Sequence, residues 1–444
     1  MRAGGIDWTA ASAEEIVPAL AASELHLDAA VAGAIRNRVA QIVMAEPAEG
    51  LAIAQALLGA MQRRARGLDA ETRAIVWRAH AEACLLSGRT RMAHRSYERA
   101  SRAATAARQP GLLGEILVGR VHVLSLVGQT AAVERLARRA ATLLRRAGNT
   151  IYLGKLYMNR GNAHYQREDY PRAHEFYRKA SDVFAEAGLE DATWAGLLIN
   201  QAIAASHLGR VGDARRIFLE AEAACQRLGL DALCAHARYD RAFLEAAGGD
   251  YRAALGLLED AGEIFEREGM LDMTASAQRA RAEIYIDLGM AEEAIELARG
   301  AARRFAKEEM PLDAMIARVH EGRALLRSGQ PDESAEILQK AERFFLERKL
   351  RPRRADALLQ QARAQLAAGE MAGAARHARQ ARGVADRLGL ARLRTQAEGV
   401  IAESLLARRR FADAERILAP TLKQARRQAA PQRVALWELA GRVA

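Results

Sequence analysis

Three residue types that can perform metal chemistry lie close together early in the chain: His80, Glu82 and Cys84. In a hydrolytic zinc site, histidine and cysteine bind the ion and a glutamate moves the proton of the bound water. Such a site needs further cysteines, and the other two, Cys225 and Cys234, lack zinc-binding spacing. The sequence therefore predicts reduced, buried thiols rather than a metal centre.

Other catalytic motifs are missing from the sequence as well. There is no Gly-rich phosphate loop, no HExxH, no nucleophile elbow and no paired CxxC. The ten histidines are scattered along the chain. We therefore expect residues 1–444 to have no catalytic activity and to bind neither a cofactor nor a metal.

Positive charge is concentrated in one link late in the chain. The cluster comprises Arg348, Lys349, Arg351, Arg353 and Arg354, with Phe344 and Phe345 just before it and Arg408–Arg410 further along. Basic clusters with nearby aromatic rings can hold the phosphates of a nucleic acid. The alternative, which we favour, is a solvated loop whose charge offsets acidic neighbours such as Glu342 and Glu347. A steep loss of binding with salt would distinguish a phosphate site from a peptide groove.

The elements that carry these residues follow a period of 40 residues. It is marked by the alanines Ala93, Ala173, Ala214, Ala254, Ala294, Ala374 and Ala414. Val133 and Ser334 occupy the two remaining marks, and only the step from 173 to 214 is longer, by one residue. A period this strict over more than 320 residues indicates stacked copies of one structural unit rather than a single globular core.

Glycine and proline mark the helix ends in each copy. We number each unit so that the marker residue is position 20; the units then begin at 74, 114, 154, 195, 235, 275, 315, 355 and 395. Position 15 is glycine in seven units (88, 128, 209, 249, 289, 329 and 369), and position 35 is glycine in five (148, 188, 229, 269 and 389). Four prolines, Pro110, Pro311, Pro352 and Pro431, occupy position 37 or 38. Glycine ends a helix and proline follows where none can continue. Each unit is thus predicted to be helix A (about 1–14), a tight turn, helix B (about 17–34) and a short link.

The pattern within the units resembles the tetratricopeptide repeat (TPR). That family has a large residue at position 4, a small one at 8, a large one at 11, alanine at 20, an aromatic at 24 and alanine at 27. The unit from 154 matches with Tyr157, Gly161, His164, Ala173, Tyr177 and Ala180, and the unit from 74 with Trp77, Ala81, Cys84, Ala93, Tyr97 and Ala100. The period is longer than usual and is similar to that of kinesin light chain. The resemblance implies an all-α, TPR-like α-solenoid of about nine 40-residue helix–turn–helix repeats in a right-handed superhelix.

In TPR superhelices, positions 2, 5, 9 and 12 of helix A point into a concave groove. TPR proteins that read peptides also use asparagine at positions 6 and 9. The resemblance therefore implies candidate groove residues, which are Lys155, Met158, Asn159, Asn162, Tyr165, Asn200, Ile203, His236, Tyr239, Phe243, Arg279, Arg323 and Arg363. Asparagine can bond both groups of a peptide backbone, and aromatic rings give contact area at low entropic cost. An acidic segment would suit the arginine-rich half. The alternative is that these residues serve only helix–helix contacts.

The two ends differ from the middle. Residues 1–28 are predicted to be an N-terminal segment with a short helix, in which Ser12 and Glu15 form a capping box. Residues 29–73 are interpreted as a diverged first repeat, 74–434 as nine TPR-like repeats, and 435–444, with Trp437, as the first helix of an incomplete tenth repeat. An open last repeat exposes apolar surface, so we expect either self-association there or a continuation of the chain.

The arginine- and alanine-rich composition resembles that of a protein from a GC-rich bacterium, and the three cysteines, predicted to be reduced, favour the cytoplasm. The net charge is +11, almost all basic residues are arginine, and no apolar run reaches membrane length. We interpret the chain as a protein- or peptide-binding scaffold, the sensor or recruitment arm of a larger protein. It resembles the N-terminal arms of bacterial TPR–CHAT proteins, whose caspase-like protease would lie outside residues 1–444. The alternatives are the ligand-sensing region of a bacterial transcription regulator and an RNA- or DNA-binding helical repeat.

Overall fold

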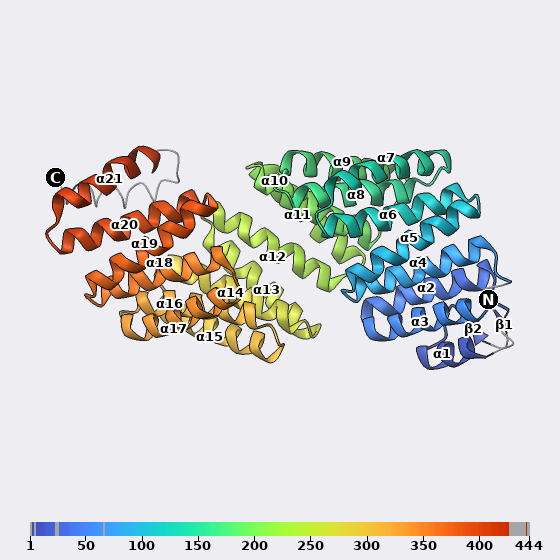
Figure 1. Cartoon of the computed structure of the whole chain (residues 1–444), viewed down its shortest axis with the longest axis horizontal. Helices are drawn as coiled ribbons and strands as arrows, with labels where there is room; N and C mark the ends of the chain where they lie inside the picture. The colour runs from blue at the N-terminus through green and yellow to red at the C-terminus, as the bar shows by residue number, and fades with distance from the viewer. Residues whose placement is uncertain (1, 4–5, 23–25, 65–66, 426–440, 442–444) are drawn as a thin grey trace. The chain divides into compact units, whose positions relative to one another are not determined.

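The computed structural model of the chain describes residues 2–3, 6–22, 26–64, 67–425 and 441. These residues form 21 α-helices and one pair of two-residue strands (Figure 1). They divide into two compact units, residues 1–233 and 234–444. The fold is an all-α, TPR-like repeat solenoid, as the sequence predicted.

The first unit begins with two short strands, β1 (Arg2–Ala3) and β2 (Ile6–Asp7), which pair antiparallel. The N-terminal segment was predicted to contain only a short helix, so these two strands are an addition to the prediction. The helices are α1 (Ala13–Ala21), α2 (Ala29–Ala45), α3 (Pro47–Arg63), α4 (Ala70–Leu86), α5 (Thr90–Ala106), α6 (Pro110–Leu126), α7 (Thr130–Arg146), α8 (Thr150–Tyr165), α9 (Tyr170–Glu186), α10 (Ala192–His207) and α11 (Val211–Arg227). Helix α1 starts at the capping box of Ser12 and Glu15, as expected.

The second unit contains the next ten helices. They are α12 (Asp231–Ala247), α13 (Tyr251–Arg267), α14 (Leu271–Leu288), α15 (Ala291–Lys307), α16 (Pro311–Arg327), α17 (Pro331–Glu347), α18 (Arg351–Ala367), α19 (Met371–Leu388), α20 (Ala391–Ala407) and α21 (Phe411–Ala425). Within this unit, helices A and B alternate and successive helices pack together, and the helices A α14, α16, α18 and α20 also contact one another in turn. The expectations for Pro431 and Trp437 fall outside the described residues.

Small residues set the spacing between helices A and B. All nine residues at position 20 are fully buried, including Ser334, whose hydroxyl donates to the Gly322 carbonyl at 2.7 Å. At position 8, a methyl group added to Gly161 would lie 2.4 Å from the Tyr177 ring. Helices this close leave no room for larger side chains, which explains the alanine and glycine period.

The helix ends show a regularity that the sequence only partly reveals. All twelve glycines at positions 15 and 35 have positive φ, as predicted. Among the described residues, five others adopt the same left-handed conformation, and each occupies a position 15 or 35 that lacks glycine: Arg108, Glu168, Glu309, Lys349 and Arg409. The hydrogen bonds are those of a Schellman motif in both cases, for example Arg89 N to Cys84 O (2.8 Å) after Gly88 and Met310 N to Phe305 O (2.9 Å) after Glu309. The repeat geometry therefore imposes this conformation whatever the residue.

We expect opposite effects from exchanging residues at two of these turns. Gly289→Ala (φ 79°) should destabilise the chain by about 1–2 kcal/mol, because an L side chain is strained in the left-handed region. Glu309→Gly (φ 56°) should stabilise it by up to about 1 kcal/mol, since it removes the same strain, partly offset by the entropy of glycine in the unfolded chain. Urea denaturation checks both variants. Equal midpoints for Gly289→Ala and wild type would contradict the account.

Helix A starts earlier than predicted. Helix α4 begins at Ala70, four residues before the unit start at 74, and the other helices A follow suit. Pro110, Pro311 and Pro352 therefore lie in the first turn of a helix A rather than in a link after helix B. Proline suits this place because the first N–H groups of a helix have no intrahelical partner.

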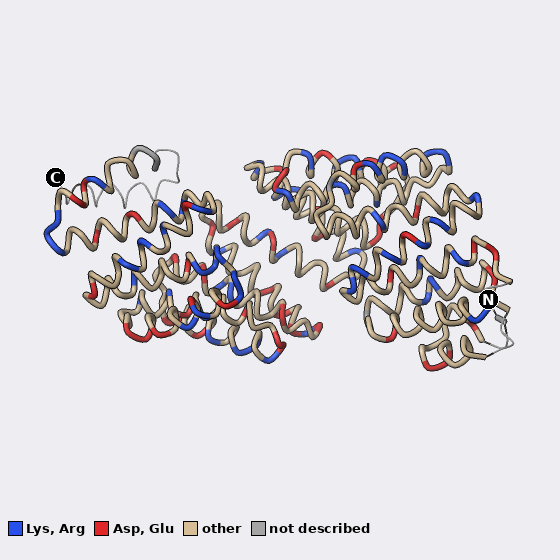
Figure 2. The backbone as a smooth tube through the Cα atoms, in the orientation of Figure 1, with Lys and Arg blue, Asp and Glu red and all other residues tan. Residues whose placement is uncertain are grey.

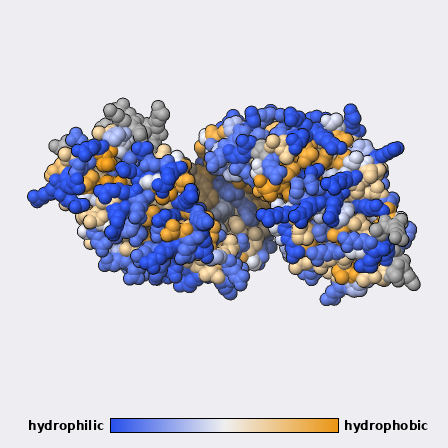
Figure 3. All heavy atoms as spheres, viewed as in Figure 1, coloured by the Kyte–Doolittle hydropathy of each residue, from blue (hydrophilic) through white to orange (hydrophobic). Residues whose placement is uncertain are grey.

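Charged residues of both signs are interspersed along the helices of each unit (Figure 2). In the space-filling view, hydrophilic residues cover most of the visible face and hydrophobic ones form separate patches (Figure 3). Among the described residues, none of the helices is both long and apolar enough to cross a membrane.

Candidate functional site

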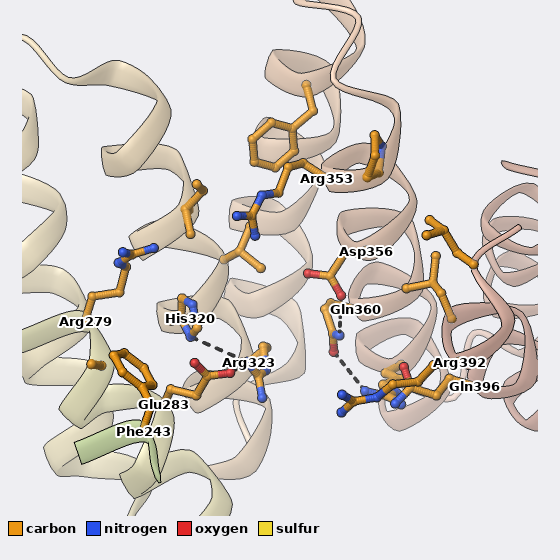
Figure 4. A pocket seen from close by; sticks show the side chains of 18 of the residues that line it. Phe243, Arg279, Glu283, His320, Arg323, Arg353, Asp356, Gln360, Arg392 and Gln396 are labelled. Atoms are coloured by element: carbon orange, nitrogen blue, oxygen red, sulfur yellow. Dashed lines mark hydrogen bonds and ion pairs between the residues drawn. The ribbon is translucent and has the colours of Figure 1, made fainter. Parts of the chain in front are cut away.

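The second unit contains a cavity of ≈ 820 Å³ (Figure 4). Its walls come mainly from the five helices A, α12, α14, α16, α18 and α20, with Phe345 of α17 and the turn at Gly389. The lining residues recur at position 5 (Tyr239, Arg279 and Val319), position 6 (Ala280, His320 and Gln360) and position 9 (Phe243, Glu283, Arg323 and Arg363). One face of successive helices A thus forms the cavity wall.

Five of the residues predicted for the groove lie together around this cavity. They are Tyr239, Phe243, Arg279, Arg323 and Arg363. His236 is not among the lining residues; its ring packs edge-on against Phe265 with the centroids 5.0 Å apart. Burial lowers the pKa of His236, so its ring is neutral at physiological pH.

Several lining residues were not among the predicted groove residues, including His320, Arg353, Asp356, Gln360 and Arg392. The sequence placed Arg353 in a basic link outside the groove, which is wrong, because its exposed side chain lines the cavity (Figure 4). Arg353 and Arg392 lie in the first turns of α18 and α20, the turns that the predicted start of helix A omitted. Gln360 and His320 occupy position 6, the position of the predicted groove residues Asn159 and Asn200.

The cavity carries more positive than negative charge. Five arginines line it, against the two carboxylates Glu283 and Asp356. Arg323 is partly neutralised by Glu283 at 3.5 Å and by Asp287 at 3.8 Å. The other four, Arg279, Arg353, Arg363 and Arg392, have no carboxylate within salt-bridge distance in the described part of the chain.

His320 lies between Arg279 and Arg323 (Figure 4). Burial, and then the positive charges of Arg323 and Arg279, lower the pKa of His320 to about 3. The imidazole is therefore neutral at physiological pH. Because Arg323 can only donate, His320 Nδ1 accepts from Arg323 Nη1 (3.5 Å), which leaves Nε2 as a donor.

A chain of hydrogen bonds orients one arginine of the cavity. Arg363 Nη1 donates to Gln360 Oε1 at 3.2 Å, and Gln360 Nε2 donates to Asp356 Oδ1 at 3.1 Å. Gln360 is buried, so the three side chains are held in one arrangement. Burial lowers the pKa of Arg363. The attraction of Asp356 raises this pKa, but the positive charges of Arg323 and Arg327 lower it further. Arg363 is thus a fixed and incompletely compensated cation.

An aromatic edge borders the charged part. The rings of Tyr239 and Phe243 pack edge to face with centroids 5.1 Å apart. Phe243 is 46% exposed, whereas Ile316 and Val319, which also line the cavity, are buried. The cavity therefore offers apolar contact area next to a cluster of cations.

The remaining predicted groove residues lie in the first unit, and two asparagines are engaged in internal contacts. Asn159 is buried and donates to the Val118 carbonyl at 3.3 Å, so it joins two neighbouring helices A. Asn162 accepts from the Tyr177 hydroxyl at 2.8 Å, which joins helices A and B. Asn159 thus follows the alternative that the sequence left open, a helix–helix contact.

The other first-unit candidates are partly buried. They are Lys155, Met158, Tyr165, Asn200 and Ile203. The Lys155 ammonium lies 5.4 Å from the centre of the Tyr152 ring. The Tyr165 hydroxyl lies 3.1 Å from His207 Nε2. Their role in binding stays a prediction.

The basic link after α17 does not form one patch. The Arg348 guanidinium carbon lies 3.7 Å from the centre of the Phe344 ring, and Arg354 Nε lies 2.7 Å from Glu342 Oε1. Arg353 faces the cavity instead. Glu342 thus offsets the charge of Arg354, as the alternative expected, but Arg354 lies in the first turn of α18 rather than in a loop.

His80, Glu82 and Cys84, the residue types of a zinc site, make internal contacts in the fold. His80 Nδ1 lies 2.9 Å from Ser96 Oγ, and the Cys84 thiol packs against the same ring. Glu82 is bound by Arg36 and Arg78. Burial raises the pKa of Cys84, which keeps the thiol protonated.

Comparison with known proteins shows similarity of structure alone. No family model matches the chain, and no curated protein matches it. A solved structure of a Rap protein complexed with Competence and Sporulation Factor aligns with a TM-score of 0.55 at 15% identity over 81% of this chain and 98% of that one. The apo form of the quorum sensor NprR from B. thuringiensis aligns with a TM-score of 0.57 at 12% identity, over 82% and 99% of the two chains.

A third structure is a Signal Transduction ATPase with Numerous Domains that has a tetratricopeptide repeat sensor, from Pyrococcus horikoshii. Its TM-score is 0.57 at 14% identity, over 84% of this chain and 53% of that one. This chain thus corresponds to about half of that longer protein. At these identities the likeness establishes the TPR-like helical repeat fold.

Proposed function

We propose that the chain is a protein- or peptide-binding TPR scaffold whose ligand occupies the cavity of the second unit. The observation that carries this proposal is the cavity itself, built by one face of five successive helices A. Its volume lies within the usual range for ligand pockets, and it combines apolar walls with a few fixed polar groups. The similar Rap structure holds a bound factor, and the similar NprR protein is a quorum sensor, which supports a binding role.

The scaffold acts, in this proposal, as the sensor or recruitment arm of a larger cytoplasmic bacterial protein. One candidate output is a CHAT caspase-like protease. The second is the ATPase and DNA-binding region of a transcription regulator, and the similarity to a signal-transduction ATPase with a TPR sensor favours it. Reading the genomic sequence around the coding region distinguishes the two. An attached or neighbouring protease supports the first, and an attached or neighbouring ATPase supports the second. If neither is found, both outputs are overturned.

Selection from a random peptide display library on the whole chain tests binding directly. We expect peptides to be enriched and to lose affinity when the cavity is altered. A variant at an exposed residue outside the cavity serves as the control. If no peptide is enriched over many rounds, or if the enriched peptides bind a cavity variant unchanged, the proposed site is wrong.

A pair of arginines in one helix turn separates peptide binding from nucleic-acid binding. Arg353→Ala is expected to lower the affinity for a selected peptide about tenfold, because a charged hydrogen-bond donor is lost from the cavity wall. Arg351→Ala, two residues away and not in the cavity wall, should leave peptide affinity unchanged. Fluorescence anisotropy checks both. A nucleic-acid site would lose affinity with either change and would weaken steeply with salt.

A further inference from the structure

The arginines that line the cavity outnumber its carboxylates. Arg279 has a buried Nε atom that makes no hydrogen bond in the described part of the chain. Its guanidinium carbon lies 5.8 Å from the centre of the Phe305 ring. A buried guanidinium N–H without an acceptor is unfavourable unless a ligand provides one.

Arg363 lies on α18, two helices A further along. The Arg363–Gln360–Asp356 chain of hydrogen bonds fixes its guanidinium. Asp356 is engaged by Gln360 and lies beyond salt-bridge distance of Arg363, so the positive charge of Arg363 stays incompletely balanced. Arg279 and Arg363 are thus two separate, oriented donors in one cavity.

We propose that the cavity selects a short acidic peptide with at least two carboxylates, bound by Arg279 and Arg363, and an apolar side chain against Phe243, Ile316 and Val319. The inference rests on the proposed function and specifies its ligand. The planar guanidinium matches a carboxylate with two parallel hydrogen bonds. The neutral His320 Nε2 and the amide of Gln396 supply donors for the peptide carbonyls.

Two features favour carboxylates over phosphates in this cavity. Glu283 and Asp356 line the same walls, and they repel a doubly charged phosphate more strongly than a singly charged carboxylate. The apolar edge at Phe243 also provides a place for a side chain, which inorganic phosphate lacks. The second unit alone supplies all of these groups, so the asparagines of the first unit are not required.

A random hexapeptide library selected on the full chain provides the test, with the acidic content of the enriched peptides as the readout. We expect most enriched peptides to carry two or more Asp or Glu residues beside a large apolar one. Replacing each acid by its amide in the best peptide should lower its affinity about tenfold per carboxylate. Inorganic phosphate should not displace that peptide.

Protein variants assign the effect to the two arginines. The double variant Arg279→Gln, Arg363→Gln is expected to bind the acidic peptide about a hundredfold more weakly and its amide analogue nearly unchanged. The control is Arg303→Gln, Arg379→Gln, with the same change of charge at exposed residues of helices α15 and α19 that do not line the cavity. Circular dichroism confirms folding, and if the double variant does not fold, the single variants carry the test.

The outcomes separate this inference from the proposed function. Enriched peptides without acidic preference would overturn the acidic specificity and leave peptide binding intact. The absence of any enriched peptide would overturn both. Equal losses in the cavity and control variants would show a general effect of net charge, and displacement by inorganic phosphate would reassign the site to phosphate; each of these overturns the inference.

Discussion

Replacing Arg78 by methionine is expected to lower the free energy of unfolding by about 3–5 kcal/mol, the largest effect of any single substitution considered. Arg78 is 4% exposed and joins helices α4, α6 and α8. It donates to Glu82 at 2.9 Å, to Glu115 at 2.5 Å and to the Tyr152 hydroxyl. Without Arg78, the partly buried carboxylates of Glu82 and Glu115 lose a cation that balances their charge. Urea denaturation measures the loss.

Two further variants separate charge from geometry at this network. Arg78→Lys keeps the charge but not the forked donors, so we expect an intermediate loss. Glu115→Gln combined with Arg78→Met removes one of the uncompensated carboxylates, and it should recover part of the stability. A methionine variant with an unchanged urea midpoint would show that the network contributes nothing.

The same network makes the free energy of unfolding depend on pH. Burial raises the pKa of Glu82, but attraction to Arg78 and Arg36 outweighs it, and the pKa is lowered overall. A carboxylate whose pKa is lowered by folding stabilises the folded state above its ordinary pKa near 4.5, and this contribution is lost as pH falls through the lowered value. We therefore expect the wild type to lose more stability than Arg78→Met between neutral pH and about pH 3.

The sequence predicted the fold because the spacing of small residues reflects a steric requirement. Position 20 has to be small where two helices meet, so alanine recurs and its period is visible without a structure. The left-handed turns are less visible. Glycine is favoured there but not obligatory, and Glu309 and Lys349 adopt that conformation because the packing of the flanking helices outweighs the local strain.

The cavity was predicted in part, and the errors have one main cause. Positions 5 and 9 led to Tyr239, Phe243, Arg279, Arg323 and Arg363, because side chains three or four apart share a helix face. Helix A, however, begins one turn earlier than glycine and proline suggested. The extra turn brings Arg353 and Arg392 onto the same face; the sequence placed Arg353 in a basic link instead, and it did not single out Arg392.

Residue type alone also could not separate ligand contacts from internal ones. In the unit from 74, positions 5 and 9 hold Arg78 and Glu82, which pair with each other. Asn159 has the side chain expected for a peptide backbone, yet it bonds the carbonyl of Val118. Such partners come from other helices, and their distances depend on the packing rather than on the pattern along one helix.

Truncating Phe243 to alanine is expected to weaken binding of a selected peptide by about 2 kcal/mol, or roughly thirtyfold. Phe243 lies at the edge of the cavity and is 46% exposed, so an apolar ligand side chain can cover it and bury it on binding. Because the ring is not part of the buried core, the unfolding midpoint should change little. Isothermal titration calorimetry measures the affinity, and a smaller loss of heat capacity on binding should accompany the loss of buried apolar area.

Phe411 provides the matched control within the same unit. It is 50% exposed, at the start of α21, and does not line the cavity. Phe411→Ala removes the same apolar area from the surface, so it reports any general effect of losing an exposed ring. If the two variants bind equally well, the aromatic edge is not part of the site. If only Phe243→Ala loses affinity, the ligand contacts the apolar end of the cavity, and the arginine variants then report independently on its charged part.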